Sequence, residues 1–117
     1  MIAVVDDDPF VRRALERLLR AYGHVVTAFE SGEQFLDSLS ASRPACVVLD
    51  LHMPKVDGFD VLKMLAEEAV SIPVVVVTAD GDPPVFARVK RLGAIACLKK
   101  PVDAGRLLVE ISAALQN

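Results

Sequence analysis

The sequence has no apolar run long enough to cross a bilayer, and it has no low-complexity stretch and no block of like charge. A membrane-spanning helix needs roughly 18 or more consecutive apolar residues. The amino terminus enters a short apolar run and then three aspartates, which is not the pattern of a signal peptide. We therefore expect a cytoplasmic protein that makes no contact with a membrane.

Cysteine is scarce and the net charge is small. The two cysteines, Cys46 and Cys97, lie inside strand-like apolar runs, and their spacing matches neither a metal site nor a disulfide framework. We expect both to be small buried residues in a reducing compartment. The formal net charge of −3 gives no broad attraction to anionic polymers, so we expect no direct binding of nucleic acid by this domain.

What the chain does contain is a repeated pattern of strand and helix. Its 117 residues, 53% of them hydrophobic and 25% charged, suit one globular domain over residues 1–117. Short apolar runs predict strands at 2–5, 25–29, 45–49, 74–77 and 94–98. An amphipathic stripe follows each run. Helix-start residues precede most stripes, at Asp8, Ser31, Asp82 and Asp103, and the loop 51–58 precedes the third. Ser31 and Gln34 have the spacing of a capping box, and Gly93 is expected to end the fourth helix.

Strands that alternate with helices predict an α/β fold, a doubly wound parallel sheet with helices on both faces, because right-handed crossovers leave few other arrangements. The continuous valines at 74–77 fit a strand that is covered on both faces. Ligands of such sheets bind outside the carboxyl ends of the strands, where the strand order reverses. If the order is 2-1-3-4-5, the first and third strands flank that point.

Polar and charged residues stand where the predicted strands end. The first strand leads into Asp6 and Asp7, the third into Asp50, the fourth into Thr78 and the fifth into Lys99 and Lys100. Parallel strands bring these groups to one edge of the sheet. Successive side chains of a strand point to opposite faces, so only one of the two lysines should reach the site, and we predict that it is Lys100.

This set of groups predicts a site for a divalent cation and a phosphoryl group. Carboxylates about 4–5 Å apart repel by roughly 3–4 kcal/mol per pair at an effective dielectric near 20. A hard cation such as Mg²⁺, which prefers oxygen ligands, would offset that repulsion. A carboxylate can attack phosphorus to form an acyl phosphate. The cation, a lysine and a hydroxyl can then neutralise or bind the oxygens of the transferred group.

Four segments with these residues resemble the receiver domain of two-component response regulators, and the resemblance covers essentially the whole chain. The segments are Val-Val-Asp-Asp-Asp-Pro at 4–9, Val-Val-Leu-Asp-Leu-His-Met-Pro at 47–54 with Asp57-Gly58, Val-Val-Thr-Ala at 76–79, and Leu-Lys-Lys-Pro at 98–101. The second segment and the helix start at 11–15 are most similar to receivers linked to helix-turn-helix transcription factors.

The resemblance implies a flavodoxin-like sheet of five parallel strands in the order 2-1-3-4-5 with five helices. It implies that Asp50 is the phosphoacceptor, supplied by a phosphohistidine of a sensor histidine kinase or phosphotransfer protein. Asp7, Asp50 and the backbone carbonyl of His52 would ligate Mg²⁺, and Asp6 would hold the ion through water. Thr78 and Lys100 would each contact a phosphoryl oxygen, and Thr78 would shift inward on activation.

The implied activity is signalling, with only self-phosphorylation and slow self-dephosphorylation. The output surface would be the fourth helix, fifth strand and fifth helix, read by docking or by a homodimer and controlling transcription. The basic residues Arg88, Lys90 and Arg91 of the fourth helix are either a solvated face or part of such a docking surface. The side chains of His52 and Asp80 either are solvated or tune the lifetime of the acyl phosphate.

One position departs from the family pattern. Receivers commonly carry Tyr or Phe three residues before the site lysine, and that ring moves inward with the threonine; here the position holds Cys97. A thiol cannot fill the volume of a ring. Either the switch runs through Thr78 and the backbone alone, or another group such as Phe86 serves, although Phe86 also reads as a core residue of its helix.

Two other functions are weighed against this one. A phosphorylation-independent pseudo-receiver would be a protein-interaction module, and Cys97 keeps that alternative open. A phosphatase of the haloacid dehalogenase kind also uses an aspartate nucleophile at a strand end, but it needs a second acid two residues later, where this chain has His52.

Overall fold

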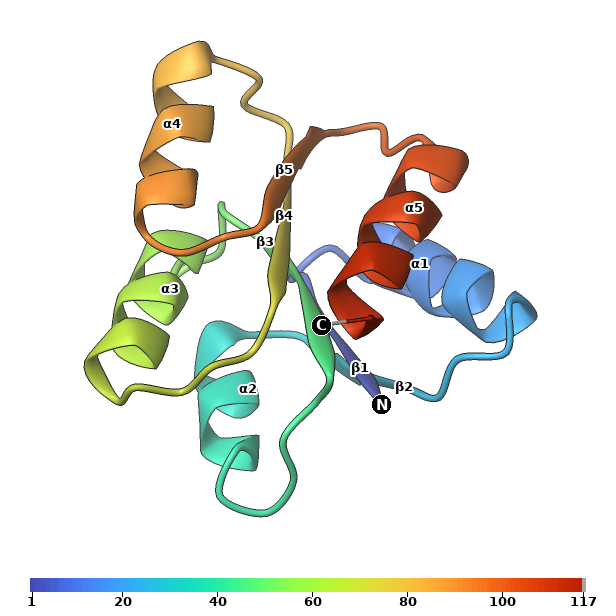
Figure 1. The fold of residues 1–117 in the computed structure, drawn as a ribbon, viewed down its shortest axis with the longest axis horizontal. Coiled ribbons are helices and arrows are strands. Elements are labelled where there is room, and N and C mark those ends of the chain that lie inside the picture. Colours follow the sequence, from blue (N-terminus) through green and yellow to red (C-terminus); the bar gives the residue numbers. More distant parts are fainter. Residues whose placement is uncertain (117) are drawn as a thin grey trace.

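The computed structural model describes residues 1–116, which form a central sheet between two layers of helices (Figure 1). The strands are β1 (Ile2–Val5), β2 (Val26–Phe29), β3 (Cys46–Asp50), β4 (Val74–Thr78) and β5 (Ala96–Lys99). The helices are α1 (Pro9–Ala21), α2 (Gly32–Ser38), α3 (Gly58–Glu67), α4 (Pro83–Arg91) and α5 (Ala104–Leu115). All strand pairs are parallel and the order is β2-β1-β3-β4-β5, so the predicted fold class and strand order are confirmed.

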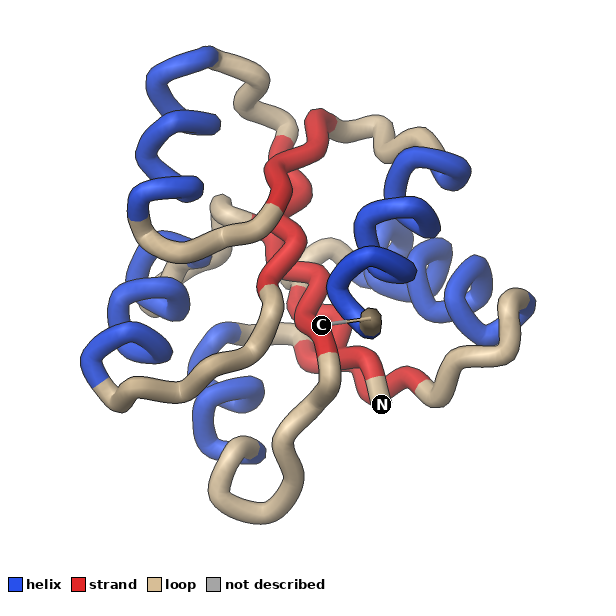
Figure 2. The backbone as a smooth tube through the Cα atoms, viewed as in Figure 1, coloured by secondary structure: helices blue, strands red, loops and turns tan. Residues whose placement is uncertain are grey.

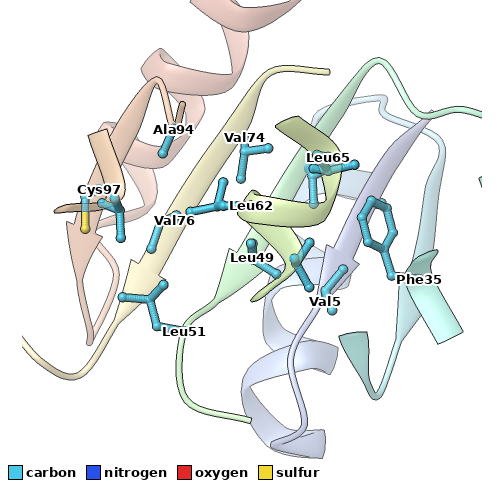
Figure 3. Close-up of a cluster of buried hydrophobic side chains, with 14 of the residues drawn as sticks. Val5, Phe35, Leu49, Leu51, Leu62, Leu65, Val74, Val76, Ala94 and Cys97 are labelled. Carbon is cyan, nitrogen blue, oxygen red and sulfur yellow. The ribbon is translucent and has the colours of Figure 1, made fainter. Parts of the chain in front are cut away.

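The helices divide between the two faces of the sheet, with α2, α3 and α4 on one side and α1 and α5 on the other (Figures 1 and 2). Because strand side chains alternate, β1 sends Val5 to the first face and Val4 to the second, and both are fully buried. Figure 3 shows the first core, where Phe35, Leu62 and Leu65 cover the sheet. Burial on both faces explains the uninterrupted apolar runs of the three central strands, β1, β3 and β4.

Most helix starts follow the sequence signals. The carboxylate of Asp8 accepts hydrogen bonds from the first turn of α1, and Asp103 does the same for α5. Ser31 accepts from the backbone N–H of Gln34 at 3.1 Å, as its spacing predicts. The return bond differs, because Gln34 Oε1 accepts from the backbone N–H of Glu30, one residue before the cap. A complete capping box occurs instead at α3, between Asp57 and Asp60.

Three predicted strands begin later than expected. β2 starts at 26 instead of 25, β3 at 46 instead of 45, and β5 at 96 instead of 94. The difference at β5 has a clear cause: Gly93, in the left-handed region with φ 108°, ends α4, and the backbone N–H of Ala94 then bonds to the carbonyl of Val89 at 3.0 Å. Ala94 therefore closes the helix, and β5 pairs fully with β4 only from Ala96, opposite Val75.

A side-chain contact joins α3 and α4, which cover the same face of the sheet. The guanidinium of Arg88 on α4 lies 4.0 Å from the ring centroid of Phe59 on α3. Such a cation–π contact contributes about 0.5–1 kcal/mol at an exposed site. Within residues 1–116, no helix is both long enough and apolar enough to cross a membrane.

Candidate functional site

Three carboxylates meet where β1 and β3 end. One oxygen from each of Asp6, Asp7 and Asp50 can be chosen so that all lie within 4.8 Å of one another. Asp6 and Asp50 are buried, whereas Asp7 is exposed. The cluster arises because β1 and β3 are neighbours in the sheet and run in the same direction. The residues from which the sequence predicted a cation site therefore lie together in space.

Asp50 is the last residue of β3, and it is only 4% exposed. Burial is the larger cause, and the negative charge of Asp6 the smaller one, that together raise the pKa of its carboxyl from 3.8 to about 6. The ammonium of Lys100 and a hydrogen bond from the backbone N–H of His52 act in the opposite direction. Asp50 is thus a desolvated carboxylate whose charge is only partly compensated by its neighbours.

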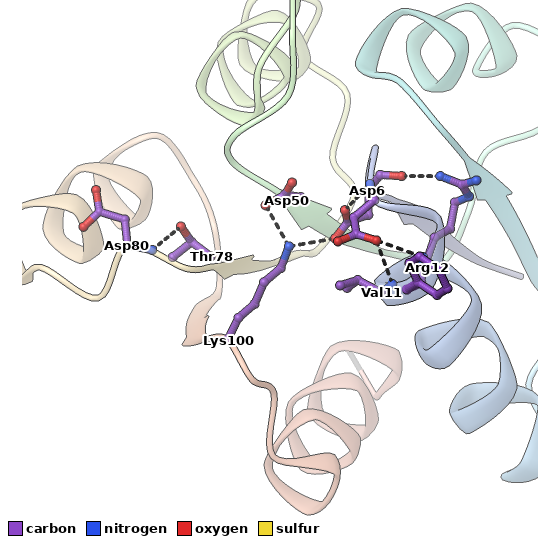
Figure 4. Close-up of polar contacts among 9 residues, drawn as sticks. Asp6, Val11, Arg12, Asp50, Thr78, Asp80 and Lys100 are labelled. Atoms are coloured by element: carbon purple, nitrogen blue, oxygen red, sulfur yellow. Dashed lines mark hydrogen bonds and ion pairs between the residues drawn. The ribbon is translucent and has the colours of Figure 1, made fainter.

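Lys100 supplies the positive charge of the site. Its Nζ lies 2.9 Å from Oδ2 of Asp6 and 3.2 Å from Oδ1 of Asp50 (Figure 4). Burial alone would lower the pKa of Lys100, but the hydrogen bond to Asp6 and the charge of Asp50 raise it. Lys99 instead extends over Gly81, and the Lys100–Pro101 peptide bond is cis.

Asp6 is held from several sides. Its Oδ1 accepts from the backbone N–H of Asp8 at 2.9 Å, and its Oδ2 binds Lys100. Its backbone carbonyl accepts from the guanidinium of Arg12 at 2.8 Å. Sequence reasoning missed this role of Arg12, although its place at the fourth position of α1 puts it within reach of the strand end. These bonds leave the exposed Asp7 as the freely accessible acid of the cluster.

Thr78 lies at the end of β4 and is fully buried. Its hydroxyl oxygen accepts from the backbone N–H of Asp80 at 3.1 Å, inside its own loop (Figure 4). Its backbone carbonyl accepts from the N–H of Lys100 at 2.7 Å, which ties β4 to the segment that carries the site lysine. The structure thus brings Thr78 to the site edge with its hydroxyl engaged by Asp80.

Two side chains flank the mouth of the site. His52 is exposed, and its Nε2 lies 4.0 Å from Oδ2 of Asp80. The imidazole comes from the loop after β3 and the carboxylate from the loop after β4, so the pair brings these two loops together. Both residues were singled out from the sequence for this location, two positions beyond Asp50 and Thr78.

Cys97 lies in the core beneath α4, where it is 8% exposed (Figure 3). Burial raises the pKa of its thiol, an effect that the charge of nearby Lys90 partly offsets. Phe86 is a partly buried residue that packs against the same cluster. Neither side chain belongs to the polar cluster around Asp50.

Gly58 fixes the backbone next to Asp50, a role that sequence reasoning did not predict. A Cβ on Gly58 would lie 2.5 Å from the carbonyl oxygen of Asp50 and 2.7 Å from Cα of Leu51. The N–H of Gly58 donates to the carbonyl of Leu51 at 2.9 Å. Helix α3 can therefore begin directly against the strand end only because residue 58 has no side chain.

The comparisons with known proteins agree with this geometry. The family described as "Response regulator receiver domain" matches residues 2–112. The transcriptional regulatory protein FixJ of Bradyrhizobium diazoefficiens is 36% identical over 116 residues, covering 99% of this chain and 57% of that protein. The response regulator protein TodT of Pseudomonas putida F1 is 35% identical over 116 residues, with 99% and 51% covered. The chain thus spans about half the length of these relatives.

Solved structures show the same fold. The crystal structure of FixJ-N superposes with a TM-score of 0.91 at 30% identity and covers 99% of this chain and 93% of that one. The BeF3-activated DrrB receiver domain superposes with a TM-score of 0.88 at 28% identity, with 99% and 97% covered. An acidic triad with a lysine at the strand ends, on this fold and with this family match, identifies the chain as a member of the response regulator receiver domain family, phosphoacceptor modules of two-component signalling.

Proposed function

We propose that residues 1–117 form one receiver domain in which Asp50 accepts a phosphoryl group from the phosphohistidine of a sensor histidine kinase or phosphotransfer protein. The observation that carries this proposal is the position of Asp50. It is a buried carboxylate at a strand end, with Asp6 and Asp7 in one acidic cluster and Lys100 Nζ 3.2 Å from its Oδ1. Family membership removes the phosphatase alternative, whose second acid would have to stand at His52.

The acidic cluster fits Mg²⁺. The carboxylates of Asp7 and Asp50 and the backbone carbonyl of His52 would hold the ion, with Asp6 bound through water. Two observations support this set: the three carboxylates offer oxygens within 4.8 Å, and Asp6 is already engaged by Lys100 and the N–H of Asp8. The bound ion would supply positive charge that offsets carboxylate repulsion and neutralises phosphoryl oxygens.

The transfer itself is one bond exchange. A carboxylate oxygen of Asp50 attacks phosphorus, the P–N bond of phosphohistidine breaks, and its electron pair stays on the imidazole nitrogen. Lys100, already within 3.2 Å of Asp50, would pair with a phosphoryl oxygen, and Thr78 would bind another through its hydroxyl. Self-dephosphorylation is the attack of water on phosphorus, which releases phosphate and restores the carboxylate.

The output of the domain is proposed from its relatives. The similar proteins FixJ and TodT are named as a transcriptional regulator and a response regulator, and this chain matches about half of each. We therefore infer that a phosphorylated domain of this kind controls transcription in the cytoplasm through the surface of α4, β5 and α5, by docking or by forming a homodimer.

Labelling with acetyl phosphate tests the phosphoacceptor role. The protein should take up one phosphoryl group in the presence of Mg²⁺ and none after chelation, and Asp50→Asn should abolish the label. Asp82→Asn is the matched control, because Asp82 lies in the next loop and its side chain makes no cap hydrogen bond. A label that survives Asp50→Asn would contradict the assignment.

A pseudo-receiver is the second candidate, favoured by one observation. Cys97 places a small thiol where the family commonly has Tyr or Phe. The aromatic ring that usually moves inward with the threonine is therefore absent. A pseudo-receiver would bind its partner equally well with and without Mg²⁺ and beryllofluoride, a mimic of the phosphoryl group. The phosphoacceptor instead predicts partner binding that depends on both reagents and on Asp50.

A further inference from the structure

We propose that the Lys99 side chain, which lies over Gly81, holds the β4–α4 loop in its resting position and has to move aside before Thr78 can reach a phosphoryl group. This inference rests on the proposed function of Asp50. It assigns to Lys99 a positioning role, distinct from the role of its neighbour Lys100 in the charged cluster.

The first observation is the contact itself. A Cβ built on Gly81 would lie 2.6 Å from Cδ, 3.0 Å from Cε and 3.3 Å from Nζ of Lys99. The stem of the lysine therefore rests directly on the glycine, and any side chain at position 81 would displace it. Gly81 lies between Asp80 and Asp82 in the segment that joins β4 to α4.

The second observation is the register of the sheet. Thr78 of β4 lies opposite Lys99 of β5, and partners in parallel strands place their side chains on the same face. That face is the one covered by α3 and α4, because Val76 and Cys97, two residues earlier on each strand, belong to its core. Lys99 thus stands beside Thr78 on the strand and reaches forward over the loop that follows it.

The third observation is the resting state of that loop. The Thr78 hydroxyl accepts from the N–H of Asp80, and the N–H of Asp82 donates to Oδ1 of Asp80 at 3.3 Å. Among the described residues, the ion pairs do not include Lys99, so its stem rather than a charge partner makes the contact. For Thr78 to turn toward Asp50, its bond to Asp80 has to open and the loop under Lys99 has to shift.

The small size of Cys97 makes Lys99 important at this end of β5. On this face, the strand presents Cys97 and then Lys99, and only the lysine has a side chain long enough to reach the loop. The aliphatic stem of a lysine can cover a surface in this way while its ammonium remains in water. Lys99 thus couples the loop to β5, although the chain lacks an aromatic ring at position 97.

Titration with beryllofluoride and Mg²⁺, followed by backbone amide shifts of residues 78–82, tests the proposal. Lys99→Ala frees the loop, so the binding-competent fraction rises and the apparent Kd for beryllofluoride should fall by about threefold. The Kd for Mg²⁺ alone should not change, because binding of the ion requires no movement of this loop. Lys99→Met keeps the stem and should behave as the unmodified protein. Lys63→Ala, at an exposed lysine of α3, is the matched control.

A double-mutant cycle with Gly81→Ala separates contact from loop stiffness. The added methyl meets only the flexible end of Lys99, so Gly81→Ala should tighten beryllofluoride binding when Lys99 is present and have no such effect beside Lys99→Ala. Additive effects, or equal Kd values for all variants, would overturn the role of Lys99. Failure of the proposed function differs: the unmodified protein itself would then not bind beryllofluoride.

Discussion

At the residue scale, the environment of Asp50 favours its protonated form in the absence of a cation. Burial and the charge of Asp6 raise its pKa from 3.8 to about 6. An acid whose pKa is higher in the folded state takes up a proton on folding, so the free energy of unfolding falls as pH rises from about 4 to about 6. Functional charge at Asp50 is therefore held at a cost to stability.

Asp50→Asn should consequently stabilise the metal-free protein at pH 7. A shift of about two units corresponds to roughly 3 kcal/mol, since each unit is about 1.4 kcal/mol. Urea unfolding in the presence of a chelator should show a gain of about 2–3 kcal/mol at pH 7 that vanishes near pH 3.5, where both forms are neutral. Equal gains at the two pH values would show that the effect is not electrostatic.

Asp7 makes a second test at this scale. If the cluster binds Mg²⁺, an ion concentration about 100 times the dissociation constant should raise the unfolding free energy by about 2.7 kcal/mol. Asp7→Asn should remove most of this gain because it takes away the exposed ligand of the cluster. Thermal unfolding with and without Mg²⁺ measures the difference, and Asp82→Asn should retain the full stabilisation.

At the scale of elements, the start of α3 depends on one missing side chain. Gly58→Ala would press a methyl group against the backbone of Asp50 and Leu51, which cannot move aside as a flexible side chain would. We expect a loss of about 2 kcal/mol or more in unfolding free energy, with weaker Mg²⁺ binding as the loop 51–58 shifts. Denaturant unfolding and a Mg²⁺ titration measure both effects.

Gly105→Ala in α5 is the matched control for that substitution. Its Cβ would come no closer than 3.4 Å to Oδ1 of Asp103, which is an ordinary contact. Alanine is the better helix former, so this variant should gain about 0.5–1 kcal/mol. The two glycine-to-alanine changes, both near the start of a helix, would then change the free energy of unfolding in opposite directions. The close approach at Gly58 explains the difference.

Element positions show which features a sequence can predict. The valine run of β4 and the alternation that selects Lys100 over Lys99 depend on local pattern, and both were predicted. The start of β5 was predicted two residues early, because the turn after Gly93 uses the N–H of Ala94 to close α4. The approach of Gly58 to Asp50 and the contact of Lys99 with Gly81 join segments through space, so no local spacing in the sequence indicates them.

At the scale of the whole molecule, the strand order decides where the site forms. The order β2-β1-β3-β4-β5 puts β1 beside β3, and the acids of both strands then meet at one edge. Alternation of strands and helices predicted a parallel sheet with helices on both faces, because few chain paths satisfy it, whereas the strand order was implied by the resemblance to the receiver family. The oligomeric state depends on the charges of the folded surface and on the partners it meets. A pattern along the chain does not determine these.

The proposed output predicts a change of mass. Beryllofluoride with Mg²⁺ should drive the domain from monomer to dimer in sedimentation velocity if the surface of α4, β5 and α5 mediates self-association. Asp50→Asn should remain monomeric under the same conditions. An unchanged mass, together with amide shifts that prove beryllofluoride binding, would contradict the dimer and leave docking as the output.

The ion pair between Asp6 and Lys100 joins residues 94 positions apart in the chain. A ribosome releases the acids of β1 and β3 long before it releases the ammonium that balances them. A nascent chain that ends at β4 therefore carries uncompensated negative charge at its incipient pocket. We therefore expect the site to become complete only when β5 has joined the sheet and brought Lys100 beside Asp6 and Asp50.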